Sequence, residues 1–328
     1  MFFAVTIVTF IIFFVIPSED DQSSLGQGGA DVDVRTTVQI DGPLYEEYAE
    51  FVGRIVTQGS LGNSWVLRGQ EVNEILVRAA PVTASLVIGG AVLWLLLAIP
   101  TGLLSALRPR SALSRVTTVF VLIGISAHPL WIGLVLSYLI GHRLELLPAG
   151  GYCEVFSPGP NCGGPLPWAS HMILPWFTFA FMYAALYMRM IRASTLETLE
   201  EDYVRTARAK GAPEWLVVRS HVLRNAMLPV VTMLGMDIAV SLSATLFVET
   251  AYGLPGLGQV MVTSLARRDF PVLLGITVYT TIVVIVVNFL IELIYGLIDP
   301  RARLTSSGEE SAQSEPQRQP VPELEPAR

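Results

Sequence analysis

The sequence predicts an all-α membrane protein with six transmembrane helices and both termini in the cytoplasm. Hydrophobic residues make up 52% of the chain and charged residues only 15%, whereas about a quarter of the residues in a soluble domain are charged. The apolar residues gather in runs that suit a bilayer core, which takes about 20 helical residues to cross. These runs cover residues 1–16, 82–107, 117–140, 173–188, 227–248 and 272–298.

The first run, 1–16, is the shortest. As a helix it reaches only ~24 Å against a core of ~30 Å, so we expect it either to thin the bilayer or to start upstream of Met1. A cleaved signal peptide is the alternative, but the segment has no basic residues ahead of its apolar stretch and no A-x-A cleavage site. We therefore interpret 1–16 as the first transmembrane helix.

Basic residues set the predicted orientation, because short loops that carry Lys and Arg stay in the cytoplasm. They gather after the second run, between the fourth and fifth runs, and after the last. These residues are Arg108, Arg110, Arg115, Arg189, Arg192, Arg205, Arg208, Lys210, Arg219, Arg224, Arg301 and Arg303. Both termini are therefore expected inside. The formal net charge of −7 has little bearing, since acidic residues barely affect topology.

The apolar runs divide the rest of the chain into a long loop, a transmembrane core and a tail. Residues 17–80 are expected to form an extracytoplasmic loop with one amphipathic helix, because apolar residues recur there at helical spacing. Five helices then form the transmembrane core, 81–303. The tail, 304–328, is rich in Ser, Glu, Gln and Pro with few large apolar residues, a composition that predicts disorder.

The cytoplasmic loop 192–226 is long for a connection. Gly211-Ala212-Pro213 places a helix-ending glycine before a helix-starting proline. We expect two short helices joined at Gly211 along the inner membrane face, with Tyr203, Ala207 and Trp215 on their apolar side. Such an element is either a docking knob for a cytoplasmic partner or a solvated connector.

The two cysteines, Cys153 and Cys162, fall in one loop on the predicted outer side. That compartment oxidises thiols, which favours a disulfide over two free thiols. We expect no metal site, because a zinc shell needs further ligands and no histidine is near in sequence. His128, His142, His171 and His221 are accordingly given no ligand role.

Asp237 falls in the middle of the run 227–248. A carboxylate inside a membrane costs roughly 2.5–3.5 kcal/mol on insertion scales and faces a bundle interior or water. Asp237 is therefore expected either to line a solute pathway, where it would meet a peptide amino terminus, or to accept a hydrogen bond from a neighbouring helix.

Several motifs resemble those of permeases in binding-protein-dependent ABC importers, and more narrowly the dipeptide, oligopeptide and nickel group. They lie in the order and spacing of that family over residues 44–303. The motifs are Gly59-Ser60-Leu61-Gly62-Asn63-Ser64, Leu147-Pro148-Ala149-Gly150-Gly151-Tyr152, the loop signature 201–211 with its continuation 221–229, Leu254-Pro255-Gly256-Leu257-Gly258, and Asp299-Pro300-Arg301. Two departures stand out. Arg205-Thr206-Ala207 replaces the Glu-Ala-Ala of the general signature, and the insert between the cysteines is atypical.

The resemblance implies a bacterial-type plasma (inner) membrane protein that spans the lipid bilayer. It also implies a second permease subunit, two ABC ATPase subunits and an extracytoplasmic substrate-binding protein as partners, with no nucleic acid. A coupling loop would seat in a groove on an ATPase subunit; its residues here are Tyr203, Arg205, Thr206, Ala207, Ala209, Lys210 and Gly211. The chain has no G-x-x-x-x-G-K-[ST] phosphate cradle, so it is not expected to be an enzyme or to hold a cofactor; ATP would bind to the partner subunits.

Peptide is the expected solute, with nickel or another small solute as the alternative. A stand-alone secondary transporter would need inverted repeats or broken helices at the membrane midplane. An intramembrane serine protease would need a serine beside a histidine base, but Ser126 and His128 are two residues apart, which is the wrong spacing for neighbours on one helix face. The sequence thus favours a permease over an enzyme.

Overall fold

The computed structural model of the protein describes residues 6–8, 44–67, 69–155 and 162–298. These residues are almost entirely helical, and the described part of the chain contains no strand beyond one isolated bridge between Asn63 and Glu71. The predicted tail 304–328 and nearly all of the predicted first span 1–16 lie outside the described residues.

Four helices are long and apolar enough to cross a membrane. They are α4 (Val72–Leu107), α7 (Pro165–Glu200), α11 (Leu228–Tyr252) and α13 (Phe270–Ile298). Each contains one of the predicted apolar runs or most of it. The chain is therefore a multi-pass membrane protein. Helices α4 and α7 are the longest, and at ~1.5 Å per residue each extends ~54 Å, well beyond the thickness of a bilayer core.

The predicted continuous span 117–140 is wrong. The chain forms α5 (Ala112–Ser126), then α6 (Pro129–Leu136) continued by the π-helical η2 (Ser137–Arg143), and the two halves are bent by 110°. Proline explains the break, because its ring removes an N–H donor and disfavours helical geometry in the preceding residue. His128 is extended, and its ring accepts a hydrogen bond from Leu130 N at the start of α6. With the bent pair counted as one span, the described residues hold five candidate spans.

The core lies between α4 and α7, which pack along much of their length. Trp94 of α4 is fully buried and stacks on Tyr183 of α7 with ring centroids 4.6 Å apart. Glycines allow the close approach: a Cβ on Gly90 would lie 2.4 Å from the Phe179 ring. Small residues at helix contacts are the usual means of close packing in membranes.

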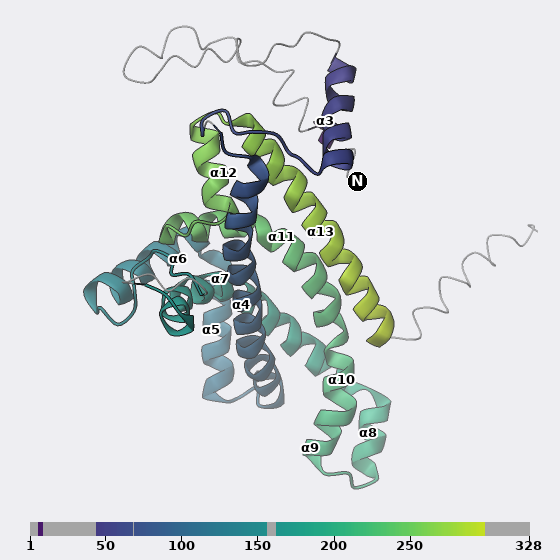
Figure 1. Ribbon diagram of the computed structural model, residues 1–328. Coiled ribbons are helices and arrows are strands. Elements are labelled where there is room, and N and C mark those ends of the chain that lie inside the picture. The colour runs from purple at the N-terminus through teal and green to yellow at the C-terminus, as the bar shows by residue number, and fades with distance from the viewer. Residues whose placement is uncertain (1–5, 9–43, 68, 156–161, 299–328) are drawn as a thin grey trace, which may run out of the picture.

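The remaining helices mark two ends of the molecule. At one end lie α3 (Leu44–Gln58), in the loop where one helix was predicted, and the short apolar α12 (Leu257–Ala266). The sequence analysis did not predict α12. At the opposite end, α8 (Asp202–Ala209), α9 (Glu214–Val217) and α10 (Leu223–Ala226) form a small lobe below the long helices (Figure 1). The π-helical η3 (Val218–Val222) joins α9 to α10.

Glu249, near the end of α11, joins three helices. It is fully buried, and its carboxylate accepts hydrogen bonds from Thr83 Oγ1 of α4 at 2.6 Å and from Gly258 N and Gln259 N of α12 at 2.7 and 3.1 Å. Thr83 Oγ1 in turn accepts from Leu257 N at 2.8 Å. The first N–H groups of α12 have no acceptor within their own helix. Glu249 and Thr83 are the acceptors of three of them.

We predict that Glu249→Ala lowers the free energy of unfolding by roughly 2–4 kcal/mol, because it leaves buried N–H and O–H donors without an acceptor. The thermal unfolding temperature of the purified chain in detergent measures the effect. Glu197→Ala, an exposed position on α7, is the control and should change little. Equal shifts in the two variants would contradict a specific role for Glu249.

Candidate functional site

The lobe of α8, α9 and α10 has a small core of its own. Val204, Val217 and Val222 are fully buried in it, with Leu199 and Ala207 packed against them. The sequence analysis missed these valines, because their positions in the chain follow no helical apolar period. Ala207 lies on the apolar side as predicted. Tyr203 and Trp215 are 40% and 64% exposed, so they are not part of this core, and their place on an apolar side along the membrane stays a prediction.

The turn between the two helical arms lies at Gly211. Its φ of +79° is a left-handed conformation that L side chains rarely adopt, and nothing lies within 4 Å of where a Cβ would stand. Glycine ends α8 here for the usual reason, since it alone adopts this geometry without steric cost. The turn is consequently open to solvent at its tip.

Polar contacts brace the lobe across that turn. Arg208 bonds Glu214 at 2.6 Å, and this contact lowers the pKa of the Glu214 carboxyl and raises that of Arg208. Both side chains are substantially exposed, so the pair contributes no more than about 1 kcal/mol. Asn225 Nδ2 also donates to Tyr203 Oη at 2.7 Å. The lobe therefore folds as one braced unit.

All but one of the residues of the predicted coupling loop are exposed. Tyr203, Arg205, Thr206, Ala209, Lys210 and Gly211 are exposed, and Ala207 alone turns partly inward. We call this set the lobe surface. Two basic side chains and an open turn make it suited to contact with another protein.

Asp237 lies on α11, where it is half-buried. Its carboxylate accepts a hydrogen bond from Tyr187 Oη of α7 at 2.8 Å, and Tyr187 packs against Trp94 with ring centroids 5.8 Å apart. The hydrogen bond to a neighbouring helix is thus present. The place of Asp237 in a solute pathway stays a prediction.

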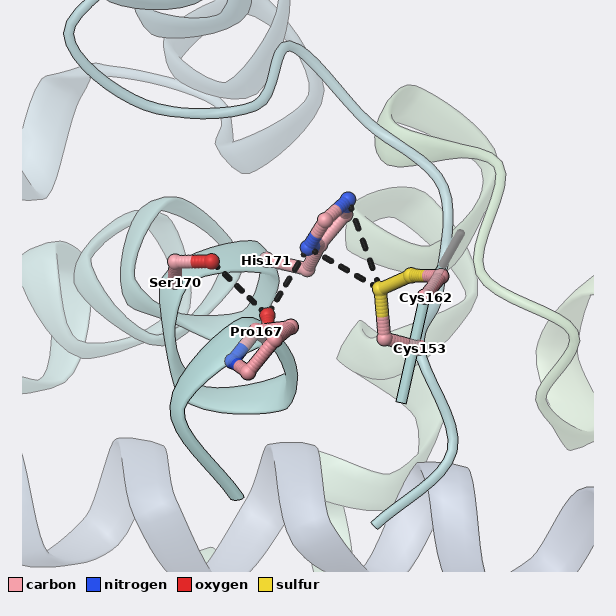
Figure 2. The surroundings of a disulfide bond; sticks show 5 residues. All are labelled: Cys153, Cys162, Pro167, Ser170 and His171. Carbon is pink, nitrogen blue, oxygen red and sulfur yellow. Dashed lines mark hydrogen bonds between the residues drawn. A yellow bond between two sulfur atoms is a disulfide. The ribbon is translucent and has the colours of Figure 1, made fainter. Parts of the chain in front are cut away.

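Cys153 and Cys162 are joined by a disulfide (Figure 2). Beside them lies His171, in the first turns of α7, with its Nδ1 3.3 Å from Cys153 Sγ. The sequence analysis gave His171 no role, because it considered only histidines that are near the two cysteines in sequence.

The chain is similar in sequence to known membrane transport proteins. The family of binding-protein-dependent transport system inner membrane components matches residues 98–304. A putative peptide permease protein of Brucella suis biovar 1 is 35% identical over 310 residues, which are 93% of this chain and 96% of that protein. A probable D,D-dipeptide transport system permease protein of Escherichia coli K12 is 34% identical and covers 90% of this chain and 92% of its own length.

An oligopeptide transport system permease protein of Bacillus subtilis is 33% identical over 90% of this chain and 93% of its own length. Among solved structures, the MetNI methionine ABC transporter in an inward-facing conformation resembles the chain with a TM-score of 0.51 and 18% identity, covering 69% of this chain and 96% of the other. At that identity the likeness concerns the fold alone.

We predict that Val217→Ser opens the lobe without unfolding the long helices. Burying a hydroxyl where an isopropyl group packed should cost roughly 2–4 kcal/mol locally. Limited proteolysis should then cut within the lobe several times faster, while the thermal unfolding temperature of the spans changes little. The neighbouring Leu216→Ser, which is 39% exposed, is the control. Equal cleavage of both variants would show that the valine core does not hold the lobe.

Proposed function

This chain belongs to the family of binding-protein-dependent transport system inner membrane components, and from that premise we propose that it imports di- or oligopeptides as one permease subunit of an ATP-driven transporter. The observation that supports this most directly is the set of relatives at 31–35% identity over at least 90% of the chain, which are named as permeases for peptides, dipeptides and oligopeptides.

In the proposed transporter the chain forms half of the translocation pathway, and a second permease subunit forms the other half. Two cytoplasmic ATPase subunits bind ATP, and a substrate-binding protein delivers the peptide from outside. The location is a bacterial inner membrane, with six spans in this chain and both termini in the cytoplasm. The chain itself carries out no hydrolysis.

The lobe surface would supply the coupling in this proposal. It lies at the opposite end of the long helices from α12 (Figure 1), and it follows directly from α7, which runs without interruption from Pro165 to Glu200. ATP can reorient the helices only if one ATPase arrangement binds the lobe better than another. A lobe with its own core and a braced turn transmits such a preference, because it moves as a unit.

A nickel or other small-solute importer is the alternative within the same family. The named relatives support peptides. A stand-alone secondary transporter is the alternative outside it, and it would leave the lobe surface without a binding partner. Such transporters use broken helices at corresponding places in two repeated halves, whereas the described residues hold one bent pair, α5 and α6.

We predict that Gly211→Arg abolishes coupling. A bulky residue at this positive φ costs about 1–2 kcal/mol of strain, and its side chain fills the space in which a groove on the ATPase would close. Uptake of a labelled dipeptide by cells that express the chain with its transport partners should fall at least about tenfold, which corresponds to ~1.4 kcal/mol. Co-purification of the ATPase subunits should fall in parallel.

Gly69→Arg is the matched control for that experiment. Gly69 also has a positive φ, +89°, with nothing near its Cβ position, but it lies in the segment that leads into α4, away from the lobe. Both variants must reach the membrane at the wild-type level. Unchanged uptake by Gly211→Arg would refute the coupling role and favour the secondary transporter.

We also predict an effect of Asp237 on the choice of substrate. If its carboxylate meets the peptide amino terminus, Asp237→Asn should reduce uptake of a dipeptide with a free amino group several-fold more than uptake of its N-acetylated form. Tyr187→Phe removes only the hydrogen bond to Asp237 and should leave the ratio of the two rates as in wild type. An identical ratio in all three proteins would assign Asp237 a purely structural role.

A further inference from the structure

The cluster of Cys153, Cys162 and His171 plays no part in the function proposed above. Cys153 is 1% exposed, whereas Cys162 and His171 are half-buried. One ligand atom from each residue can be chosen so that all three lie within 4.8 Å of one another. Figure 2 shows the imidazole of His171 extending from α7 toward the two sulfur atoms.

The orientation of His171 is set by its backbone neighbour. Nδ1 lies 2.8 Å from the carbonyl oxygen of Pro167, one turn earlier in α7. A carbonyl oxygen only accepts, so Nδ1 carries the proton and donates it there. Nε2 is then left with its lone pair free for a ligand role. Metal-binding histidines almost always donate their other ring N–H to a carboxylate, a backbone carbonyl or water, and Pro167 O fills that role here.

The distances also suit a metal ion. A tetrahedral zinc ion, with Zn–S of ~2.3 Å and Zn–N of ~2.1 Å, separates the sulfur and nitrogen ligand atoms by ~3.6 Å. In this structure His171 Nε2 lies 3.7 Å from Cys153 Sγ. The nitrogen thus already stands at about the spacing that a shared ion requires, although the disulfide leaves no thiolate to bind one.

We propose that Cys153, Cys162 and His171 are the three protein ligands of a site for a thiophilic divalent cation of the Zn²⁺ type, which opens when the disulfide is reduced. Two thiolates and one imidazole are the ligands that such ions prefer. Water completes the shell at the fourth position. The two cysteines are joined in either state, by the disulfide when oxidised and through the ion when reduced, and the ion also ties them to His171 of α7.

The two states interconvert by a balanced exchange. A thiolate of an external dithiol attacks Cys162 Sγ, which belongs to the less buried of the two cysteines, and Cys153 Sγ leaves. The second thiol of the dithiol then attacks the mixed disulfide, releases Cys162 and becomes a cyclic disulfide. The dithiol loses two electrons and the protein gains two thiols. Binding of the cation displaces both thiol protons to solvent.

The test measures metal binding by the full-length chain in detergent, before and after reduction by a dithiol that is then removed. Because the chain has only two cysteines, every thiol signal comes from this site. Reduced protein should bind one Zn²⁺ per chain in competition with a chromogenic chelator. Co²⁺ should give a thiolate-to-metal charge-transfer band, and Zn²⁺ should slow alkylation of both thiols at least about tenfold. Oxidised protein should show none of these effects.

His171→Asn should weaken Zn²⁺ binding at least about tenfold, in line with the loss seen when a metal site is disturbed. His142→Asn, an exposed histidine at the end of η2, is the matched control and should bind as wild type. Thermal unfolding of both variants checks that they fold.

Three results would overturn the proposal. Equal Zn²⁺ binding by oxidised and reduced protein would place the metal elsewhere. Unchanged affinity in a folded His171→Asn variant would make the histidine a packing residue. Failure of the reduced wild-type chain to bind Zn²⁺ or Co²⁺ would leave a structural disulfide only. None of these readouts depends on transport, so the proposal and the peptide-import function fail or stand separately.

Discussion

The arrangement of the described helices depends on where backbone N–H groups find acceptors away from water. In hydrocarbon each unsatisfied group costs several kcal/mol, so a helix that begins within the protein must have its first turn satisfied by other residues. At α12 this is done by Glu249 and Thr83. One buried carboxylate thereby fixes the ends of α11 and α12 against α4, and the positive end of the α12 dipole favours its negative charge.

The same constraint explains three of the motifs that mark the sequence. Gly258 approaches α11 so closely that a Cβ there would lie 2.6 Å from Leu246 Cα. Gly151, from the motif that begins at Leu147, donates its N–H to Tyr252 O at the end of α11. In the motif that begins at Gly59, Gly62 O accepts from Val72 N at the start of α4. Segments far apart in sequence are thus held by backbone contacts at one end of the molecule.

Much of this fold could be predicted from composition, because apolar runs of bilayer length have few alternatives. Runs 82–107, 173–188, 227–248 and 272–298 all lie in long helices, almost completely. The break at His128 was missed because Pro129 interrupts a run without making it polar, so hydropathy alone does not register it. The helical lobe around Gly211 could be predicted from glycine and proline, but its valine core could not, since those residues carry no apolar period. His171 was missed because spatial proximity to Cys153 arises only from the fold.

Helix α7 connects three features that lie far apart in the molecule. Its first turns hold His171, its middle stacks Tyr183 and Tyr187 on Trp94, and its last residues lead into α8. A rod of ~54 Å that tilts by about 5° moves its far end by ~5 Å. The disulfide-bearing loop lies beside the first turns of α7, and α8 follows directly from its last residue. If α7 pivots near its first turns, the displacement is therefore largest at the lobe.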